Sequence, residues 1–215
     1  MKYKGIIFDM DGVLFDTERL YQETWKEIAD GRNIILSPEF SKEISGTNGN
    51  YMKQVVEKHY KVSDGRGIME ECMRKMEKKL DSQIPIKPGV YEILECYKQA
   101  GVQMAVASSS PVERIERNLR KGRIRDFFSA IVSGKDVKRG KPYPDIFILA
   151  ARKISCTPSE CIVYEDSENG VKAGFAAGCC TIMIPDLIKP NDEMKRMCSE
   201  IYSSFCEVLE AGRFI

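Results

Sequence analysis

Long hydrophobic runs are missing from this sequence. Each apolar segment among its 215 residues is far shorter than the ~20 residues that a helix needs to cross a bilayer. The N-terminus, MKYKGIIFDMDG, begins with basic residues, but Asp9 interrupts its apolar stretch after about four residues, which is too short for a signal-peptide core. We therefore expect a cytoplasmic protein with no membrane partner.

An excess of charge of one sign is missing as well. The sequence has 33 Lys and Arg residues against 32 Asp and Glu residues, which gives a net charge of +1. A surface that binds polyanions has no support in this balance, so no nucleic-acid partner is expected. The apolar fraction of 43% and the charged fraction of 30% are ordinary for a globular protein. The length suffices for one core with a smaller appendage.

Histidine is nearly absent, and the cysteines lack the spacing of a metal site. His59 is the one histidine, and none of the eight cysteines forms a C-x-x-C pair. These two absences argue against a zinc site. Most cysteines lie inside apolar patterns, so we interpret them as reduced thiols that pack as small hydrophobic groups. A redox nucleophile is the alternative, and it would need an electropositive environment.

Short apolar runs alternate with amphipathic stretches over most of the chain, which predicts an α/β fold with a Rossmann-like, doubly wound parallel sheet. Helical spacing occurs over residues 91–100, 111–121, 146–153 and 171–177. The predicted strands are Lys4–Phe8, Val102–Ala107, Ala130–Gly134, Cys161–Glu165 and Cys180–Ile184, with a weaker sixth near Ile201.

The region 18–83 has a different character. It has no convincing strand, and its helical patterns are separated by turn-rich segments such as SGTNGN. A block of helices between the first strand and the rest of a sheet indicates an inserted cap. The sequence therefore predicts an α/β core domain of residues 1–17 and 84–215 and a helical cap domain of residues 18–83. A single continuous helical domain is the alternative, but it would leave the first strand without a partner.

Polar residues follow four of the predicted strands. Ligands of doubly wound sheets bind outside the carboxyl ends of the strands, so these residues are the candidates for a functional site. They are Asp9 and Asp11 after the first strand, Ser108, Ser109 and Ser110 after the second, Lys141 after the third, and Glu165 and Asp166 after the fourth.

The acidic residues of this set need a counter-charge. Residues two apart on an extended strand point the same way, so Asp9 and Asp11 face one cleft if the strand continues. Together with Asp166 they cannot all stay ionised, because like charges raise one another's pKa. No Lys, Arg or His lies between Gly5 and Thr17 to neutralise them. A Mg²⁺ ion, which favours oxygen ligands, would resolve the repulsion.

With Mg²⁺ in place, the other groups fit phosphoryl transfer. An aspartate can attack phosphorus and form an acyl-phosphate, which splits a difficult transfer into two steps. Asp11 can protonate the leaving alcohol and then activate the incoming water. Ser108 can donate a hydrogen bond to a phosphoryl oxygen, and Lys141 supplies a compact positive charge for the transferred group.

Four motifs, in this order, resemble the haloacid dehalogenase-like superfamily, in particular its β-phosphoglucomutase-like phosphatases with a helical cap inserted after the first strand. The resemblance covers essentially the whole chain. The motifs are DMDGVLFDT for the pattern D-x-D-G-[VT]-x-x-D-[ST], MAVASSS for the strand that ends in Ser or Thr, KPYPDIF for the lysine loop, and EDSENG for the last acidic motif.

The resemblance implies a role for each motif residue. Asp9 would be the nucleophile that accepts the phosphoryl group, and Asp11 would be the acid and base. Ser108 and Lys141 would grip the phosphoryl group.

The same resemblance implies the metal ligands. A carboxylate oxygen of Asp9, the main-chain carbonyl of Asp11 and the side chain of Asp166 would hold the Mg²⁺ ion. Glu165 would support the metal's outer coordination. Gly12 fits the tight turn after the nucleophile.

Substrate contacts are expected from the cap and from the serine segment. Mutases of this family carry a His four residues after the hinge Thr17, where this sequence has Tyr21, and a basic residue in a cap loop that here reads SGTNGNYM. Both departures favour a phosphatase that acts on a small phosphorylated metabolite, such as a sugar phosphate or a nucleotide. A β-phosphoglucomutase-type mutase is the alternative. The expected substrate-binding residues are Thr17, Tyr21, Gly46, Thr47, Asn48, Ser109 and Ser110.

Two further classes share parts of this pattern. Receiver modules also use an acidic cluster, Mg²⁺, a Ser or Thr and a Lys, but they are much shorter and place the accepting Asp after a later strand. A non-catalytic phosphate-binding protein is disfavoured because every motif position carries the required chemistry. A monomer is the expected state.

Some of these residues also have plain structural interpretations. Ser109 and Ser110 could cap the helix that follows Pro111. Trp25 is interpreted as part of the cap core, and His59 as a surface or packing residue of the cap.

Overall fold

The computed structural model describes residues 3–44, 47, 49–82 and 84–212. Its backbone divides into two compact units, Met1–Phe15 with Pro85–Ile215, and Asp16–Ile84. We call the first the α/β unit and the second the helical unit. The chain thus leaves the α/β unit after the first strand and returns to it for the other strands.

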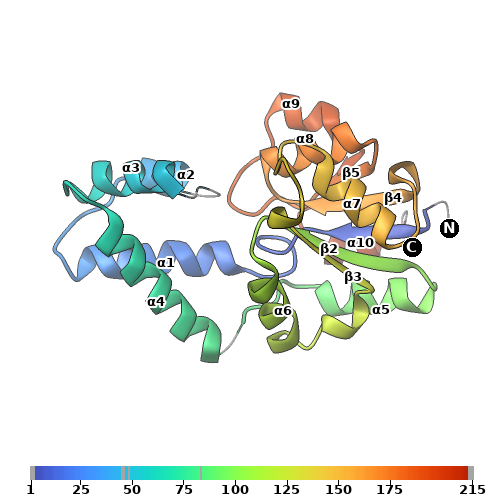
Figure 1. Ribbon diagram of the computed structural model, residues 1–215, viewed down its shortest axis with the longest axis horizontal. Coiled ribbons are helices and arrows are strands. Elements are labelled where there is room, and N and C mark those ends of the chain that lie inside the picture. The colour runs from blue at the N-terminus through green and yellow to red at the C-terminus, as the bar shows by residue number, and fades with distance from the viewer. Residues whose placement is uncertain (1–2, 45–46, 48, 83, 213–215) are drawn as a thin grey trace. The chain divides into compact units, whose positions relative to one another are not determined.

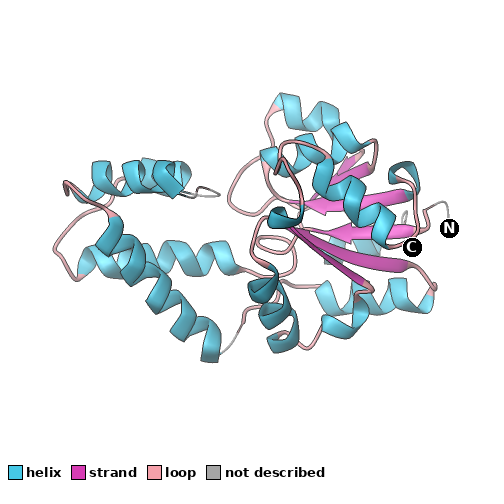
Figure 2. Cartoon of the chain, in the orientation of Figure 1, coloured by secondary structure: helices cyan, strands magenta, loops and turns pink. Residues whose placement is uncertain are grey.

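The α/β unit is built on a sheet of six parallel strands in the order β3-β2-β1-β4-β5-β6 (Figure 2). The predicted parallel sheet is therefore confirmed, including its weak sixth strand. The strands are β1 (Gly5–Phe8), β2 (Gln103–Ser108), β3 (Ala130–Ser133), β4 (Cys161–Glu165), β5 (Cys180–Met183) and β6 (Glu200–Ile201).

Strand β1 shows how the sheet is covered on both faces. Successive side chains of a strand point to opposite faces. Ile7 packs into the apolar cluster that contains Phe147, whereas Phe8 stacks on Tyr164 and meets Phe205 on the opposite face. Because neither face is solvated, the strand reads as a continuous apolar run in the sequence.

Helices supply both covering layers. α7 and α8 pack on one face of the sheet, and α5 and α10 pack on the other (Figure 1). This arrangement confirms the doubly wound fold class. The helices of the α/β unit are α5 (Val90–Gln99), α6 (Val112–Lys121), α7 (Asp145–Lys153), α8 (Glu168–Ala177), α9 (Asp192–Met197) and α10 (Phe205–Ala211), with short 3-10 turns η1 (Arg125–Phe127), η2 (Gly134–Asp136) and η3 (Pro158–Glu160).

The helical unit contains helices and no strand in its described residues. Its centre is aromatic, because Trp25, Phe40 and Tyr60 pack edge to face and the hydroxyl of Tyr60 donates to the carbonyl of Trp25 at 2.6 Å. His59 packs on Phe40 and lies 3.0 Å from the carboxylate of Glu43. Trp25 and His59 therefore have the packing roles predicted for them. The helices are α1 (Thr17–Asp30), α2 (Pro38–Ile44), α3 (Gly49–Tyr60) and α4 (Arg66–Ser82), of which α2 was not predicted.

Two predictions from composition can be compared with the structure. All eight cysteines are free thiols, as the sequence suggested. Within the described ranges, no helix is both long and apolar enough to cross a lipid bilayer.

Candidate active site at the carboxyl edge of the sheet

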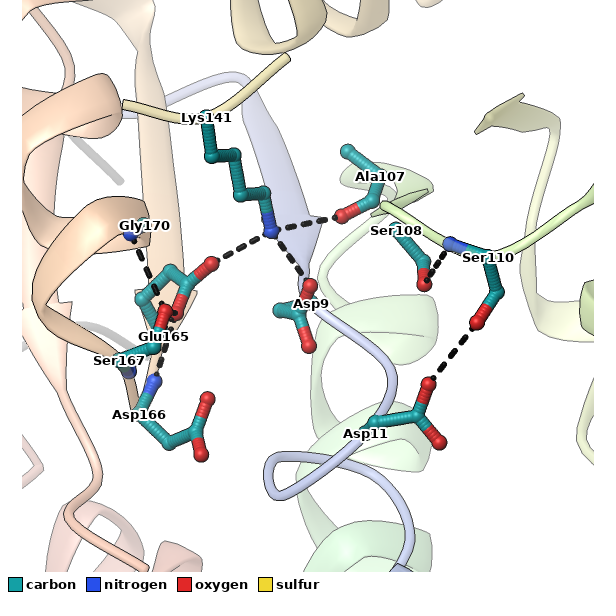
Figure 3. A network of polar contacts seen from close by, with 10 residues as sticks. All are labelled: Asp9, Asp11, Ala107, Ser108, Ser110, Lys141, Glu165, Asp166, Ser167 and Gly170. Carbon is teal, nitrogen blue, oxygen red and sulfur yellow. Dashed lines mark hydrogen bonds and ion pairs between the residues drawn. The ribbon is translucent and has the colours of Figure 1, made fainter. Parts of the chain in front are cut away.

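Three neighbouring strands bring their polar ends together. The amide of Asp9 donates to the carbonyl of Tyr164 at 3.0 Å, so the chain after β1 stays in register with the end of β4. β2 lies on the other side of β1 and ends at Ser108. Ser108, Asp9 and Glu165 therefore stand in a row along the carboxyl edge (Figure 3).

Lys141 ties this row together. Its ammonium group donates to Asp9 Oδ1 at 2.5 Å, to Glu165 Oε1 at 2.5 Å and to the carbonyl of Ala107 at 3.3 Å (Figure 3). It also lies 5.0 Å from the ring centre of Phe147. The side chains of Lys141, Asp9 and Glu165 are 6%, 10% and 0% exposed, so this ion pair is shielded from water.

Burial and ion pairing shift the pKa values of Asp9 and Lys141 in opposite directions. Burial raises the pKa of Asp9 to about 7, and Lys141 limits the rise while Glu165 and Asp11 add to it. Burial alone would lower the pKa of Lys141, but the charges of Asp9 and Glu165 outweigh burial, and that pKa lies above its ordinary value. Lys141 therefore stays cationic, and Asp9 is poised to titrate near neutrality.

Glu165 is fixed by the chain that follows it. Its Oε2 accepts hydrogen bonds from the amides of Asp166 and Ser167 at 2.9 and 3.0 Å, and from the hydroxyl of Ser167 at 3.0 Å. The same hydroxyl accepts from the amide of Gly170 at 3.1 Å and so caps α8. A Cβ on Gly170 would lie 1.8 Å from the Glu165 carboxyl group, so only glycine fits there. Glu165 is a rigid partner of Lys141.

Asp166 lies against the turn that follows Asp9. Gly12 has a φ of +86°, and a Cβ there would come within 2.2 Å of Asp166 Oδ2. Among the described residues, no hydrogen-bond donor reaches the Asp166 carboxylate. Burial, with Glu165 and then Asp9, raises the pKa of Asp166 well above its ordinary value, and Asp186 adds to the effect. Lys141 offsets only part of this rise, so the Asp166 carboxylate is the least compensated of the group.

Asp11 does not follow the geometry expected of a continued strand. β1 ends at Phe8, and the chain then folds into a compact loop in which the amides of Leu14 and Phe15 donate to the carbonyl of Met10. The carboxylate of Asp11 consequently points toward β2 and α6 rather than toward Lys141 (Figure 3). The condition for aligning Asp9 with Asp11 by strand alternation is therefore not met, because β1 ends at Phe8 and the chain turns at Gly12.

The three serines after β2 have different surroundings. Ser108 is buried and its Oγ accepts from the amide of Ser110 at 3.1 Å, whereas Ser109 is exposed. The hydroxyl of Ser110 donates to Asp11 Oδ2 at 3.1 Å. Neither Ser109 nor Ser110 caps α6, because the residue at its N-cap is Pro111 and no side chain caps the helix. The capping interpretation was therefore wrong.

Residues of the helical unit are described only by contacts within that unit. Thr17 is buried at the start of α1, and Tyr21 contacts the sulfur of Met73 at 3.8 Å. The hydroxyl of Thr47 donates to the carbonyl of Ile44 at 2.7 Å. Gly46 and Asn48, which were also predicted to bind substrate, lie outside the described residues. The role of all five in substrate binding stays a prediction.

Arg114 is a site residue that the sequence did not reveal. It lies in the first turn of α6, and its guanidinium group is 3.4 Å from Asp11 Oδ1. Nothing in its sequence neighbourhood marks it, because it follows no strand and belongs to no motif. Lys87 and Asp186 form a second unpredicted pair, 2.6 Å apart, in which the loop after β5 supplies the aspartate.

The residues at this edge fit a divalent cation by charge and donor type. No group of three or more His, Cys, Asp and Glu side chains in the described part of the chain is arranged as a metal cluster. Within the described residues, Lys141 pairs with both Asp9 and Glu165, and Arg114 pairs with Asp11, so the four carboxylates outnumber these two cations. All four offer the oxygen donors that hard cations prefer. They are Asp9, Asp11, Glu165 and Asp166.

The polar groups of this doubly wound sheet lie at the carboxyl edge, where α/β proteins of this kind bind ligands. The chain belongs to the haloacid dehalogenase-like hydrolase family, which matches it over residues 6–184. This finding confirms the family resemblance and the prediction of a hydrolase. Hydrolases of this family generally use a divalent metal ion.

Named relatives agree with this assignment, and a solved structure shares the fold. The chain is 31% identical to the phosphorylated carbohydrates phosphatase of Thermotoga maritima over 81% of this chain and 82% of that protein. It is 30% identical to the β-phosphoglucomutase of Bacillus subtilis over 81% and 80% of the two chains. A HAD family hydrolase from Deinococcus radiodurans R1, solved with bound phosphate and sodium, shares the fold with a TM-score of 0.84 and 23% identity, covering 98% of this chain and 95% of that one.

Proposed function

We propose that this protein is a Mg²⁺-dependent phosphatase that hydrolyses small phosphomonoesters through an aspartyl-phosphate on Asp9. One observation carries the proposal. Asp9 is a buried carboxylate that is held by Lys141 and flanked by Ser108 and Asp11 at the edge where doubly wound sheets bind ligands. A solvated surface aspartate would have none of these neighbours.

Mg²⁺ is the proposed metal because the site offers carboxylate oxygens and an unbalanced negative charge. Asp9, Asp166 and the main-chain carbonyl of Asp11 would hold it, with Glu165 in support. When bound, the ion would neutralise negative charge on the phosphate, so that the phosphate would repel an anionic nucleophile less. The raised pKa of Asp166 supports this fit, because that carboxylate has no hydrogen-bond donor of its own among the described residues.

In the first step, the Asp9 carboxylate forms a bond to phosphorus while the bond from phosphorus to the leaving oxygen breaks. Asp11 transfers a proton to that oxygen, so the product leaves as an alcohol. Lys141 and Ser108 would hold the phosphoryl oxygens during the transfer. In the second step, Asp11 removes a proton from water, which attacks phosphorus and releases phosphate from Asp9.

Sugar phosphates are the proposed substrates, with nucleotide-like monoesters as a wider class. The relative from Thermotoga maritima is named for phosphorylated carbohydrates, and its similarity covers most of both chains. Thr17, Tyr21, Gly46, Thr47 and Asn48 of the helical unit are the proposed specificity residues. The monomeric state, the cytoplasmic location and the absence of a nucleic-acid partner stay predictions from the sequence.

A β-phosphoglucomutase activity is the second candidate, because one relative carries that name. The sequence argues against it at Tyr21, where such mutases have a histidine, and in the loop SGTNGNYM, which has no arginine. Supplying glucose 1-phosphate isomers distinguishes the two activities. A phosphatase releases inorganic phosphate, whereas a mutase forms glucose 6-phosphate.

A panel of phosphorylated metabolites, assayed for released phosphate, tests the proposal. We expect activity with Mg²⁺ and none after chelation. Asp9→Asn should abolish hydrolysis with the fold intact, and Asp11→Asn should slow it by ~10²–10⁴ through loss of acid and base help. Full activity of Asp9→Asn would remove Asp9 from the nucleophile role.

A further inference from the structure

One face of α6 contacts the loop that carries the two aspartates. Arg114 and Asn118 are four residues apart on this helix and so lie on the same face. The amide nitrogen of Asn118 is 3.9 Å from the sulfur of Met10, and the guanidinium group of Arg114 is 3.4 Å from the next residue, Asp11. Helix α6 therefore supports two consecutive residues of the loop.

The position of Arg114 is fixed by the start of its helix. Pro111 has a φ of −59° at the N-cap, and its carbonyl accepts from the amide of Arg114 at 3.0 Å. Ile115 and Leu119 of the same helix are completely buried. The backbone that carries Arg114 is thus anchored, and its side chain is only 21% exposed.

The carboxylate of Asp11 is held from two sides. Arg114 contacts Oδ1, and the hydroxyl of Ser110 donates to Oδ2 at 3.1 Å. Ser110 is itself tied to β3, because its carbonyl accepts from the hydroxyl of Ser133 at 2.7 Å. Two donors on different elements leave the Asp11 carboxylate little freedom to rotate.

We propose that Arg114 is a positioning residue for proton transfer by Asp11. The inference rests on the proposed function of Asp11 as the acid. As the proton moves from Asp11 to the leaving oxygen, the bond from that oxygen to phosphorus breaks and the bond from Asp9 to phosphorus forms. Negative charge then returns to Asp11, where the guanidinium group of Arg114 attracts it.

This role makes a specific demand on the leaving group. An alkoxide is a poor leaving group and needs the proton, whereas p-nitrophenolate departs readily without it. Loss of Arg114 should therefore slow the cleavage of an alkyl phosphate more than that of an activated aryl phosphate. A residue that merely stabilises the fold would affect both substrates equally.

The test compares two probes of similar size, benzyl phosphate and p-nitrophenyl phosphate. The measured quantity is kcat/KM, which reports the steps up to the departure of the alcohol. For Arg114→Met we expect kcat/KM for benzyl phosphate to fall about tenfold and kcat/KM for p-nitrophenyl phosphate to change little. A loss of about tenfold corresponds to the removal of one hydrogen bond to a charged group. Arg114→Lys keeps the charge and should lose less on benzyl phosphate.

Arg120→Met is the matched control. Arg120 lies in the last turn of α6, is 71% exposed and pairs with Glu116. Its removal should leave kcat/KM unchanged for both probes. Should Arg114→Met lose its fold by circular dichroism, Arg114→Gln takes its place with the same expected selectivity.

The outcomes separate this inference from the proposed function. Equal losses on both probes, or no loss on either, in a folded Arg114 variant would overturn the positioning role. Asp11→Asn provides the reference, because it should lose more activity on benzyl phosphate than on p-nitrophenyl phosphate. If Asp11→Asn shows no such preference, the acid role of Asp11 fails. If Asp11→Asn loses more activity on benzyl phosphate but the Arg114 variants do not, Asp11 keeps its acid role and the positioning role of Arg114 fails.

Discussion

The two ends of the central sheet bury very different groups, although the same strands reach both. At the amino edge, β1 starts at Gly5, against the thiols of Cys156 and Cys161. Burial raises the pKa of both thiols, so they stay neutral. The ion pair at this edge, Lys4 with Glu160, lies on the surface.

At the carboxyl edge, the same two strands end in charged groups that are out of water. β1 runs into Asp9 and β4 ends at Glu165, and Lys141 bridges them. Burying ions costs several kcal/mol each unless they are well paired. The amino edge shows that the fold does not require such groups at its strand ends. The charges at the carboxyl edge therefore point to function rather than to folding.

Removing a lysine from each edge tests this contrast most strongly. Lys141→Met leaves two buried carboxylates without their cation, so we expect a loss of about 3–5 kcal/mol in the free energy of unfolding and loss of phosphatase activity. Lys4→Met should leave activity unchanged and stability nearly so, because water screens the surface pair. Urea denaturation followed by circular dichroism gives the stabilities. Similar losses at the two edges would remove the distinction between them.

The pH dependence of stability provides the next test. The pKa of Asp9 is about 7 in the folded protein and 3.8 in its ordinary state. Between these values the folded protein keeps a proton that the unfolded chain has lost. The metal-free protein should therefore lose stability as pH rises from about 4 to about 7, on the order of a few kcal/mol.

The matched variant for this pH test is Asp9→Asn, which should make the fall of stability with pH less steep, while the raised pKa of Asp166 keeps part of it. Mg²⁺ should restore stability to the unaltered protein, and increasingly so at higher pH, because it binds the ionised carboxylate. Thermal melting across this pH range measures both effects. If the stability of the unaltered protein and that of Asp9→Asn change equally with pH, Asp9 is not the group that titrates.

Two glycines give the smallest expected difference between the edges. A Cβ on Gly170 would overlap the carboxyl group of Glu165, which Lys141 holds in place. A Cβ on Gly5 would meet the ends of Ile154, Cys161 and Cys156, the nearest at 2.7 Å. Gly170→Ala should cost about 1–3 kcal/mol and lower activity. Gly5→Ala should cost less and leave activity intact, since those apolar side chains can shift.

The sequence predicted the strands and their terminal residues well for a physical reason. A strand buried on both faces is a continuous apolar run, so its end is visible where Asp9 or Glu165 interrupts it. Parallel neighbours then bring those ends to one edge. The short helices α2, α9 and α10 were missed because each is about two turns or less and carries too few residues to show a period.

The remaining part of the site depends on tertiary structure. Arg114 reaches Asp11 only because α6 packs beside the aspartate loop, and no spacing in the sequence encodes the rotation of that helix. The direction in which the Asp11 side chain points depends on the turn at Gly12, where φ is +86°. Lys141 and Arg114 supply part of the positive charge that the sequence analysis assigned to Mg²⁺.

Trapping the covalent intermediate shows whether Asp9 carries the phosphoryl group during turnover. The protein is mixed with a substrate and Mg²⁺, quenched in acid within milliseconds and digested, and the peptide that contains Asp9 is analysed by mass spectrometry. We expect one added phosphoryl group on Asp9 in the unaltered protein, and none in Asp9→Asn. Continued turnover with an unmodified Asp9, or a phosphoryl group on a different residue, would show that Asp9 is not the nucleophile.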